Sequence, residues 1–163
     1  MVVSDTSPLN YLVLIGQINI LPILYGQVLI PQAVYEELSA PETPEAVREW
    51  RANLPSWIEA QPEQLTPDTG LNHLHAGERD AISLALSIQA DGLIIDERRG
   101  REEAEKRGLK VIGTLGVIAA AHERGLLDLV ETFDRLRQTT FHVSPKLLAA
   151  ILRKYQGSAE EVS

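Results

Sequence analysis

The chain has 163 residues, of which 44% are hydrophobic and 23% are charged, as in an ordinary soluble globular protein. This length allows one domain with a substantial core and no covalent staples. The formal net charge of −8 excludes a nucleic-acid binder that relies on a generally basic surface, because phosphates repel an acidic protein. The sequence contains no cysteine, which excludes disulfides and thiolate zinc sites and agrees with a reducing cytoplasm.

The sequence shows no targeting signal. The N-terminal residues lack a basic stretch followed by an apolar run, so we expect no signal peptide. No apolar run approaches the ~20 residues that a membrane helix needs. We therefore expect a cytoplasmic protein with a single domain over residues 1–156, followed by a disordered tail over residues 157–163.

The first half of the chain alternates short apolar segments, typical of strands, with amphipathic segments, typical of helices. In chain order these are a strand Val2–Ser4, two short helices within Leu9–Leu24 broken around Gly16, a strand Val28–Ile30, helices Gln32–Leu38 and Glu45–Asn53, and a strand Trp57–Ala60. The Pro-rich stretch 55–67 is interpreted as an edge strand with a loop.

The second half continues the alternation. In chain order it contains a helix Gly77–Ala90, a strand Leu93–Ile95, a helix Arg98–Lys106, a strand Val111–Ile112, and helices Gly116–Arg124, Leu126–Leu136 and Pro145–Tyr155. Strands that alternate with helices predict βαβ units, and therefore an α/β fold with a parallel sheet and helices on both faces.

Two aspartates follow predicted strands directly. Asp5 ends the first strand in "VVSDTSPL", and Asp96 ends the fourth in "GLIIDERR". Because parallel strands end at the same edge of a sheet, and because neighbouring strands lie roughly 4.8 Å apart, these carboxylates could lie within about 10 Å of each other. A lone aspartate at such a place is more often a turn or cap residue. Two aspartates at the same edge of the sheet instead favour a functional site.

Further acids lie on the helices that flank this edge. Glu36 and Glu37 follow the second strand, and Glu78 and Asp80 begin the helix that leads into the fourth. Glu78 and Asp80 point about 200° apart on a helix, one on each flank of its apolar stripe, so either could reach the edge. Clustered carboxylates repel one another, and a hard divalent cation such as Mg²⁺ or Mn²⁺ relieves that repulsion.

These motifs resemble those of the PIN domains, a family of metal-dependent nucleases that includes the VapC-type toxins of toxin–antitoxin pairs. The resemblance covers residues 2–155 and rests on "DTSPL", "IPQAVYEEL", "GERDAISLA" and "IIDERRGREEAEKRGLKVIGTLG" in this order. It implies a three-layer α/β/α PIN-like fold with a five-stranded parallel sheet in the order 3-2-1-4-5.

The resemblance also implies roles for individual residues. The four catalytic acids of the family match Asp5, Glu37, Asp80 and Asp96, with Glu37 a better match than Glu36. The metal ligands would come from Asp5, Glu78, Asp80, Asp96 and Glu97. The substrate contacts would come from Ser7, which follows the first acid, and from Arg98, Arg99 and Arg101, which follow the fourth and suit phosphate.

The activity that follows is a Mg²⁺- or Mn²⁺-dependent endoribonuclease that leaves a 5′-phosphate and a 3′-hydroxyl. The resemblance further implies the toxin of a type II toxin–antitoxin pair, with a small antitoxin protein as partner, and a homodimer. The apolar content of Leu9–Leu24 also favours a dimer. The alternative is a catalytically inactive PIN-fold module that binds RNA or a protein. A haloacid-dehalogenase phosphatase is disfavoured, because Ser7 stands where its second aspartate is needed.

Overall fold

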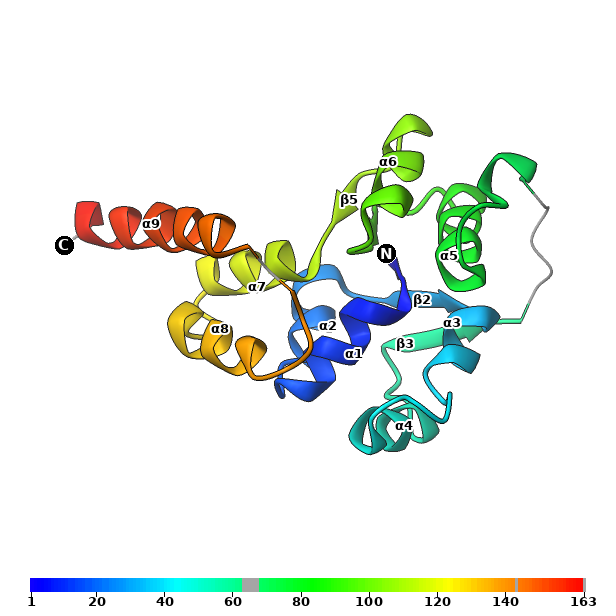
Figure 1. Ribbon diagram of the computed structural model, residues 1–163, viewed down its shortest axis with the longest axis horizontal. Helices are drawn as coiled ribbons and strands as arrows, with labels where there is room; N and C mark the ends of the chain where they lie inside the picture. Colours follow the sequence, from blue (N-terminus) through cyan, green and yellow to red (C-terminus); the bar gives the residue numbers. More distant parts are fainter. Residues whose placement is uncertain (63–67, 143, 163) are drawn as a thin grey trace.

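The computed structural model describes residues 1–62, 68–142 and 144–162, with side chains through residue 155 (Figure 1). Within these residues, five parallel strands form one sheet in the order β3-β2-β1-β4-β5. This order and the helices on both faces confirm the three-layer α/β/α fold. The strands are β1 (Val2–Ser4), β2 (Val28–Pro31), β3 (Ile58–Gln61), β4 (Gly92–Ile94) and β5 (Val111–Ile112).

All predicted helices are present, with ends that shift by a few residues. Their bounds are α1 (Thr6–Leu14), α2 (Ile20–Tyr25), α3 (Gln32–Glu37), α4 (Glu45–Ala52), α5 (Ala76–Ser87), α6 (Arg98–Lys106), α7 (Thr114–Glu123), α8 (Leu129–Arg137) and α9 (Pro145–Val162). A 3₁₀ turn, η1 (Thr69–Leu71), precedes α5. The largest difference is that α9 continues past the expected end at Tyr155. Three ends differ by three residues: α1 begins before the expected Leu9, α5 ends before the expected Ala90, and α8 begins after the expected Leu126.

The predicted break between the first two helices is confirmed. Gly16 follows α1 with φ of +73°, a left-handed conformation that favours glycine. The apolar side chains of this region mostly enter the protein's own core, with Leu9, Leu12 and Leu21 fully buried. Ile23 on α2 is the exception, because 51% of its surface is exposed.

The two faces of the sheet carry alternate residues of each strand, as the period of two requires. Val2, Ile30 and Ile94 contribute to one core, which packs against α1, α2, α7 and α8. Val3, Leu29 and Ile95 contribute to the other, which packs against α5 and α6. Both faces of β1, β2 and β4 are covered, so these strands are mostly apolar, whereas the edge strand β3 carries Glu59 and Gln61. Acids appear just past the carboxyl ends of the central strands, with Asp5 after β1 and Asp96 after β4.

The pairing register brings these two strand ends together. Ser4 pairs with Ile94, and the Asp5 amide donates a hydrogen bond to the carbonyl oxygen of Ile94 at 2.9 Å. Asp96 lies two residues beyond Ile94, so both carboxylates emerge at the same edge between the central strands. α1 and α6 begin there as well.

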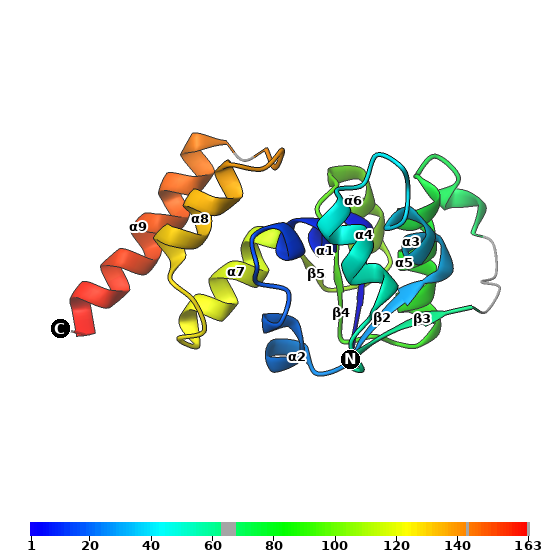
Figure 2. The same cartoon turned by 90° about the horizontal axis from the view of Figure 1, so that it is seen from below.

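The last helix, α9, lies next to α8 at one end of the molecule, opposite α5 (Figures 1 and 2). In the part of the chain that the structure describes, no helix is both long and apolar enough to cross a membrane. The side chains of residues 156–163 lie outside the described part of the chain. The expected domain boundary at residue 156 and the expected disordered tail over residues 157–163 stay predictions. Part of the expected loop before η1, residues 63–67, also lies outside them.

Candidate functional site

Asp5 is a buried carboxylate with acidic neighbours. Only 5% of its surface is exposed. It occupies the N-cap position of α1, yet its side chain makes no capping hydrogen bond, so helix capping does not explain it. The pKa of Asp5 is raised to about 7, mainly by burial and also by the charges of Glu78, Glu37 and Asp96, while the hydrogen bond from the Thr6 amide partly opposes the rise.

Glu37, at the end of α3, reaches across to two other elements. Its Oε2 accepts a hydrogen bond from the Thr6 hydroxyl of α1 at 2.5 Å, and its Oε1 accepts one from the Gly77 amide of α5 at 3.1 Å. These two donors fix the carboxylate beside Asp5. Its neighbour Glu36 is exposed, so the structure brings Glu37 and not Glu36 to the edge.

Glu78 is the acid of α5 that faces the other carboxylates. It is 8% exposed, and its pKa rises to about 7 because of burial, the charge and hydrogen bond of Glu97, and the charge of Glu37. Asp80 is more exposed, at 27% of its side chain, and forms an ion pair with Arg79 at 3.1 Å. The structure therefore brings Glu78 to the edge and leaves Asp80 on the flank of α5.

Asp96 is held by the start of α7. Its Oδ1 accepts a hydrogen bond from the Thr114 amide at 2.7 Å, and its Oδ2 accepts one from the Thr114 hydroxyl at 2.6 Å. Burial raises the pKa of Asp96, while the two Thr114 bonds and the charge of Arg101 lower it. The carboxylate is thus fixed in orientation by one residue that donates twice.

Glu97 follows at the N-cap of α6. Its Oε2 accepts a hydrogen bond from the Gly100 amide at 2.9 Å, which caps the helix. Because Glu97 lines a small pocket together with Glu78 and its charge raises the pKa of Glu78, it belongs to the same group. We call Asp5, Glu37, Glu78, Asp96 and Glu97 the acidic edge.

Two glycines let backbone approach the acidic edge closely. A Cβ on Gly77 would lie 2.5 Å from Oε2 of Glu37. A Cβ on Gly113 would lie 2.6 Å from Nη1 of Arg101 and 3.1 Å from Oδ1 of Asp96. A side chain at Gly77 would therefore displace the Glu37 carboxylate, and one at Gly113 would displace the Arg101 guanidinium and crowd Asp96.

Three cavities meet at Ser7. A pocket of about 420 Å³ is lined by Asp5, Glu37 and Glu78, together with Thr6, Ser7 and His75 among others. A second cavity of about 680 Å³ lies beside Asp96 and Glu97. A third, a groove of about 1000 Å³, runs along α1 from Thr6 and Ser7.

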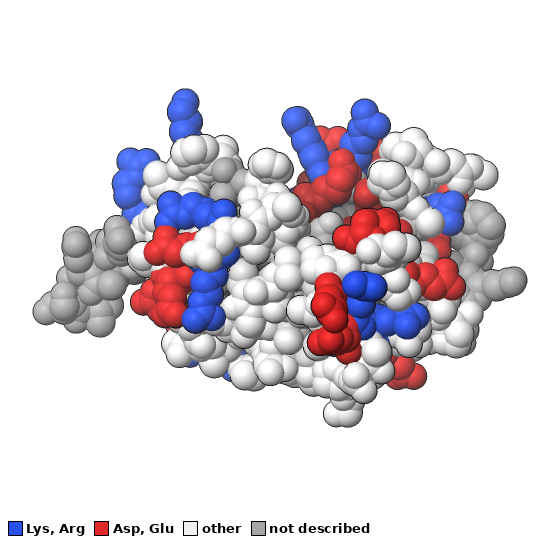
Figure 3. Space-filling view, turned by 60° about the horizontal axis from the view of Figure 1, so that its bottom comes forward, with Lys and Arg blue, Asp and Glu red and all other residues white. Residues whose placement is uncertain are grey.

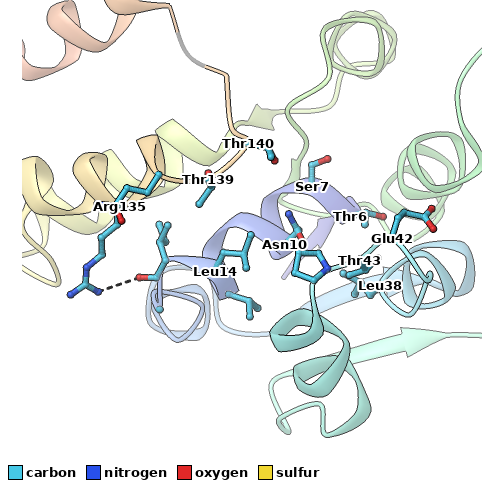
Figure 4. Close-up of a pocket in the computed structure, with 15 residues that line it drawn as sticks. Thr6, Ser7, Asn10, Leu14, Leu38, Glu42, Thr43, Arg135, Thr139 and Thr140 are labelled. Atoms are coloured by element: carbon cyan, nitrogen blue, oxygen red, sulfur yellow. Dashed lines mark hydrogen bonds between the residues drawn. The ribbon is translucent and has the colours of Figure 1, made fainter.

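Figure 4 shows the groove. Thr139 and Thr140 line it opposite α1, and Arg135 lies at its far end, where Nη1 donates a hydrogen bond to the Ile15 carbonyl oxygen at 3.4 Å. Figure 3 shows acidic side chains gathered in a hollow of one face, with basic side chains projecting beside it. The acidic edge is therefore open to a ligand from several directions.

The structure distinguishes the three arginines expected to contact substrate. Arg101 lies next to Asp96 and lines the cavity beside it. Arg99 lines a small pocket of about 170 Å³ together with Glu78 and Glu97. Arg98 instead pairs with Glu102 on the exposed face of α6, at 3.0 Å, and is 90% exposed.

The donor set suits a hard divalent cation in kind. The acidic edge offers only oxygen ligands, which Mg²⁺ and Mn²⁺ prefer. Within the described residues, no three acidic or histidine side chains stand close enough to enclose an ion directly. Mg²⁺ keeps several waters and is often held by one or two carboxylates, and the 420 Å³ pocket has room for a hydrated ion. The residues present therefore fit a water-rich cation site.

The sequence reasoning missed Thr114 and the hydrogen-bond donors to Glu37. Thr114 follows β5 at the same edge as Asp5 and Asp96, so the strand-end argument that found the aspartates could also have found it. The donors Thr6 and Gly77 come from elements far from Glu37 in the chain, and no local pattern signals them.

The raised pKa of Asp5 predicts how its removal changes stability with pH. Between the ordinary value of 3.8 and about 7, the folded protein holds a proton that the unfolded chain has lost, so stability falls as pH rises through this window. Asp5→Asn removes this cost. We expect a gain in unfolding free energy on the order of 1–4 kcal/mol near pH 8 that disappears near pH 4.

Denaturant unfolding with a chelator present, at several pH values, measures this gain. Glu36→Gln, which changes an exposed acid next to the site, is the matched control and should show no such trend. An equal effect of Asp5→Asn at all pH values would contradict the assigned pKa.

Comparison with known proteins agrees with this geometry. No curated protein and no solved structure gives a significant match to the chain. A family model described as a PIN domain matches residues 1–157, nearly the whole chain. PIN domains are generally nucleases that use divalent metal ions, and the order of the sheet is the one that the sequence resemblance implied. The chain belongs to the PIN-domain family.

Proposed function

We propose that this protein is a Mg²⁺- or Mn²⁺-dependent endoribonuclease that hydrolyses RNA phosphodiester bonds. The observation that carries the proposal is the burial of Asp5 among three other carboxylates, with its pKa raised to about 7. A domain that only binds RNA or protein gains nothing from this repulsion. A nuclease gains a place for a cation that meets the substrate phosphate.

The cation would be held, in part through its bound waters, by Asp5, Glu78 and Asp96, with Glu37 and Glu97 beside them. When bound, it supplies a hydroxide nucleophile near neutral pH and positive charge opposite the attacked phosphate. Thr114 orients the carboxylate of Asp96, and Thr6 and Gly77 orient that of Glu37, through hydrogen bonds. Such fixed orientation avoids reorganisation during the reaction.

Arginine and serine side chains near the acidic edge would position the RNA substrate. Arg101 lies beside Asp96, where its guanidinium can contact a phosphate oxygen adjacent to the cleaved bond. Ser7 offers a hydroxyl at the point where the three cavities meet. Arg99 stands near Glu78 and Glu97 on the other side. Arg98, exposed and paired with Glu102, would contact only a more distant phosphate.

The biological role that we propose is that of a VapC-type toxin in a type II toxin–antitoxin pair, acting in the cytoplasm. An unregulated ribonuclease would damage its host, so a small antitoxin should cover the acidic edge. An arginine or lysine of that antitoxin would pair with several carboxylate oxygens at once. Its inhibitory segment should be basic, unfolded when free, and ordered along the edge between Glu37 and Asp96.

The nuclease proposal predicts metal-dependent cleavage that requires the acidic edge. Purified protein should cut RNA with Mg²⁺ or Mn²⁺ and stop when the metal is chelated. Asp5→Asn should lose at least about 100-fold in rate, because it removes a charge that the reaction needs, while the fold is retained. Gel assays on single-stranded and structured RNA, with end-group analysis for 5′-phosphate products, measure this.

Two matched pairs sharpen the test. Glu37→Gln should lose activity while Glu36→Gln, one residue away and exposed, should not. Glu78→Gln should lose more than Asp80→Asn, since only Glu78 is buried with the other carboxylates. An Asp5→Asn protein that cuts as fast as the parent would sink the nuclease assignment and leave the binding module.

The toxin role predicts a complex with the product of the adjacent small gene. Co-expression should yield a complex that co-purifies and shows no nuclease activity, because the basic segment displaces the metal. Co-purification followed by cleavage assays checks this. A complex that keeps full activity at saturating Mg²⁺, or the absence of any complex, would favour a nuclease outside a toxin–antitoxin pair.

We also propose a homodimer that leaves the acidic edge free. Ile23 on α2, Val130 on α8 and Leu147 on α9 each expose about half of their surface. Burying such side chains against a second copy would be favourable. Light scattering at micromolar concentration should give twice the chain mass of 18.0 kDa, and Ile23→Asp should weaken the dimer without loss of cleavage. A strictly monomeric mass would count against this arrangement.

A further inference from the structure

A cavity of about 680 Å³ lies on the Asp96 side of Ser7, and the reaction proposed above assigns no ligand to it. It is bounded by α1, by the start of α6, by β5 and α7, by residues 140–142 and 144, and by α9. Its volume lies within the range of about 300–1,000 Å³ that small-molecule sites occupy. It shares Asp96, Glu97 and Ser7 with the acidic edge and its neighbouring pockets, so a ligand in it lies directly beside the reacting centre.

An aromatic pair forms one wall of this cavity. The rings of Tyr11 and Phe141 meet at 84° with centroids 5.0 Å apart, a T-shaped contact. The Tyr11 hydroxyl lies 3.0 Å from Oγ1 of Thr140, in a hydrogen bond that fixes the ring. Both residues are partly exposed and line the cavity while they also pack against the core. The two rings therefore give the cavity wall an aromatic surface.

The remaining lining combines apolar and polar groups. Val111, Leu115 and Ile151 give an apolar floor, while Ser7, His142 and Ser144 place hydrogen-bonding groups around it. Arg101 is the basic residue that lines the cavity, and among the described residues it forms no salt bridge within 4 Å. This lining matches a nucleotide. The base would lie between the apolar and aromatic side chains, and the phosphate would contact Arg101 next to the acidic edge.

We propose that this cavity is a base-specificity pocket, in which one nucleobase next to the cleaved phosphate stacks on the Tyr11–Phe141 pair while Arg101 contacts the phosphate. The proposal rests on the proposed ribonuclease function and adds which part of the substrate is read. A base that must leave its neighbours to enter the pocket also favours single-stranded RNA over a duplex. The polar groups on the cavity wall then distinguish one base from another.

Binding of the four nucleoside 5′-monophosphates, followed by NMR with a chelator present, tests the pocket without any cleavage. We expect the amide signals of Gly113, Thr140 and Phe141 to shift, and one base to bind at least about fivefold more tightly than the weakest. Phe141→Ala should weaken binding by about 5- to 100-fold and remove the preference, as loss of a stacking ring does. Phe141→Leu keeps an apolar side chain and should also lose the preference, which separates stacking from misfolding.

Tyr155→Ala is the matched control. Tyr155 lies on α9 in a similar T-shaped contact, with His122 at 5.6 Å, but outside the cavity. It should leave nucleotide affinity within about twofold of the parent. Unchanged binding in Phe141→Ala and Phe141→Leu, or shifts confined to other regions, would overturn the pocket.

Cleavage of short RNAs that differ only in the two nucleotides flanking the cut separates this proposal from the nuclease proposal. If the parent protein cleaves with a base preference at one flanking position, and Phe141→Leu abolishes that preference, both the pocket and the nuclease proposals are supported. Cleavage without base preference, unchanged in Phe141→Leu, overturns the pocket and leaves the nuclease. Base-selective nucleotide binding that needs Phe141, in a protein that cuts no RNA, supports the pocket as a nucleotide site and overturns the nuclease.

Discussion

The structure is organised around a buried carboxylate that forms no ion pair with any described residue. Asp5 ends the central strand, is almost inaccessible, and faces three other acids. Such an arrangement costs free energy at neutral pH, because burial and like charge both disfavour the ionised form. Proteins retain costs of this kind at functional sites, where a ligand relieves them. A divalent cation is the ligand that relieves this one most directly.

The rest of the fold holds that arrangement in place. Donors from α1, α5 and α7 orient Glu37 and Asp96, and glycines at 77 and 113 let the backbone come close enough to do so. Each donor comes from an element that also packs on the sheet, so the positions of the carboxylates depend on the whole core. A change in helix packing would therefore act on the site, even where it touches none of the acids.

The position of Ser7 explains how one edge can serve both chemistry and recognition. The pocket with Asp5, the groove along α1 and the aromatic cavity open on either side of it. A strand of RNA that crosses Ser7 would place a phosphate near the acids and its neighbouring nucleotides in cavities of different character. The overall charge of −8 does not oppose this, because Arg99 and Arg101 gather positive charge where the strand would pass.

The sequence by itself determined the class of fold and half of the site. Alternating strand and helix patterns predicted the parallel sheet, and parallel strands end at one edge, so Asp5 and Asp96 could be placed together from topology alone. The choice between Glu78 and Asp80 could not be made in this way. The two point to opposite flanks of α5. The rotation of that helix about its axis is set by Ala81, Ile82 and Ala85, which pack in the same core as Val3, Leu29 and Ile95 of the sheet. Only the tertiary structure decided it, as it decided that Thr6, Gly77 and Thr114 hold the carboxylates, because such contacts join residues that no local period relates.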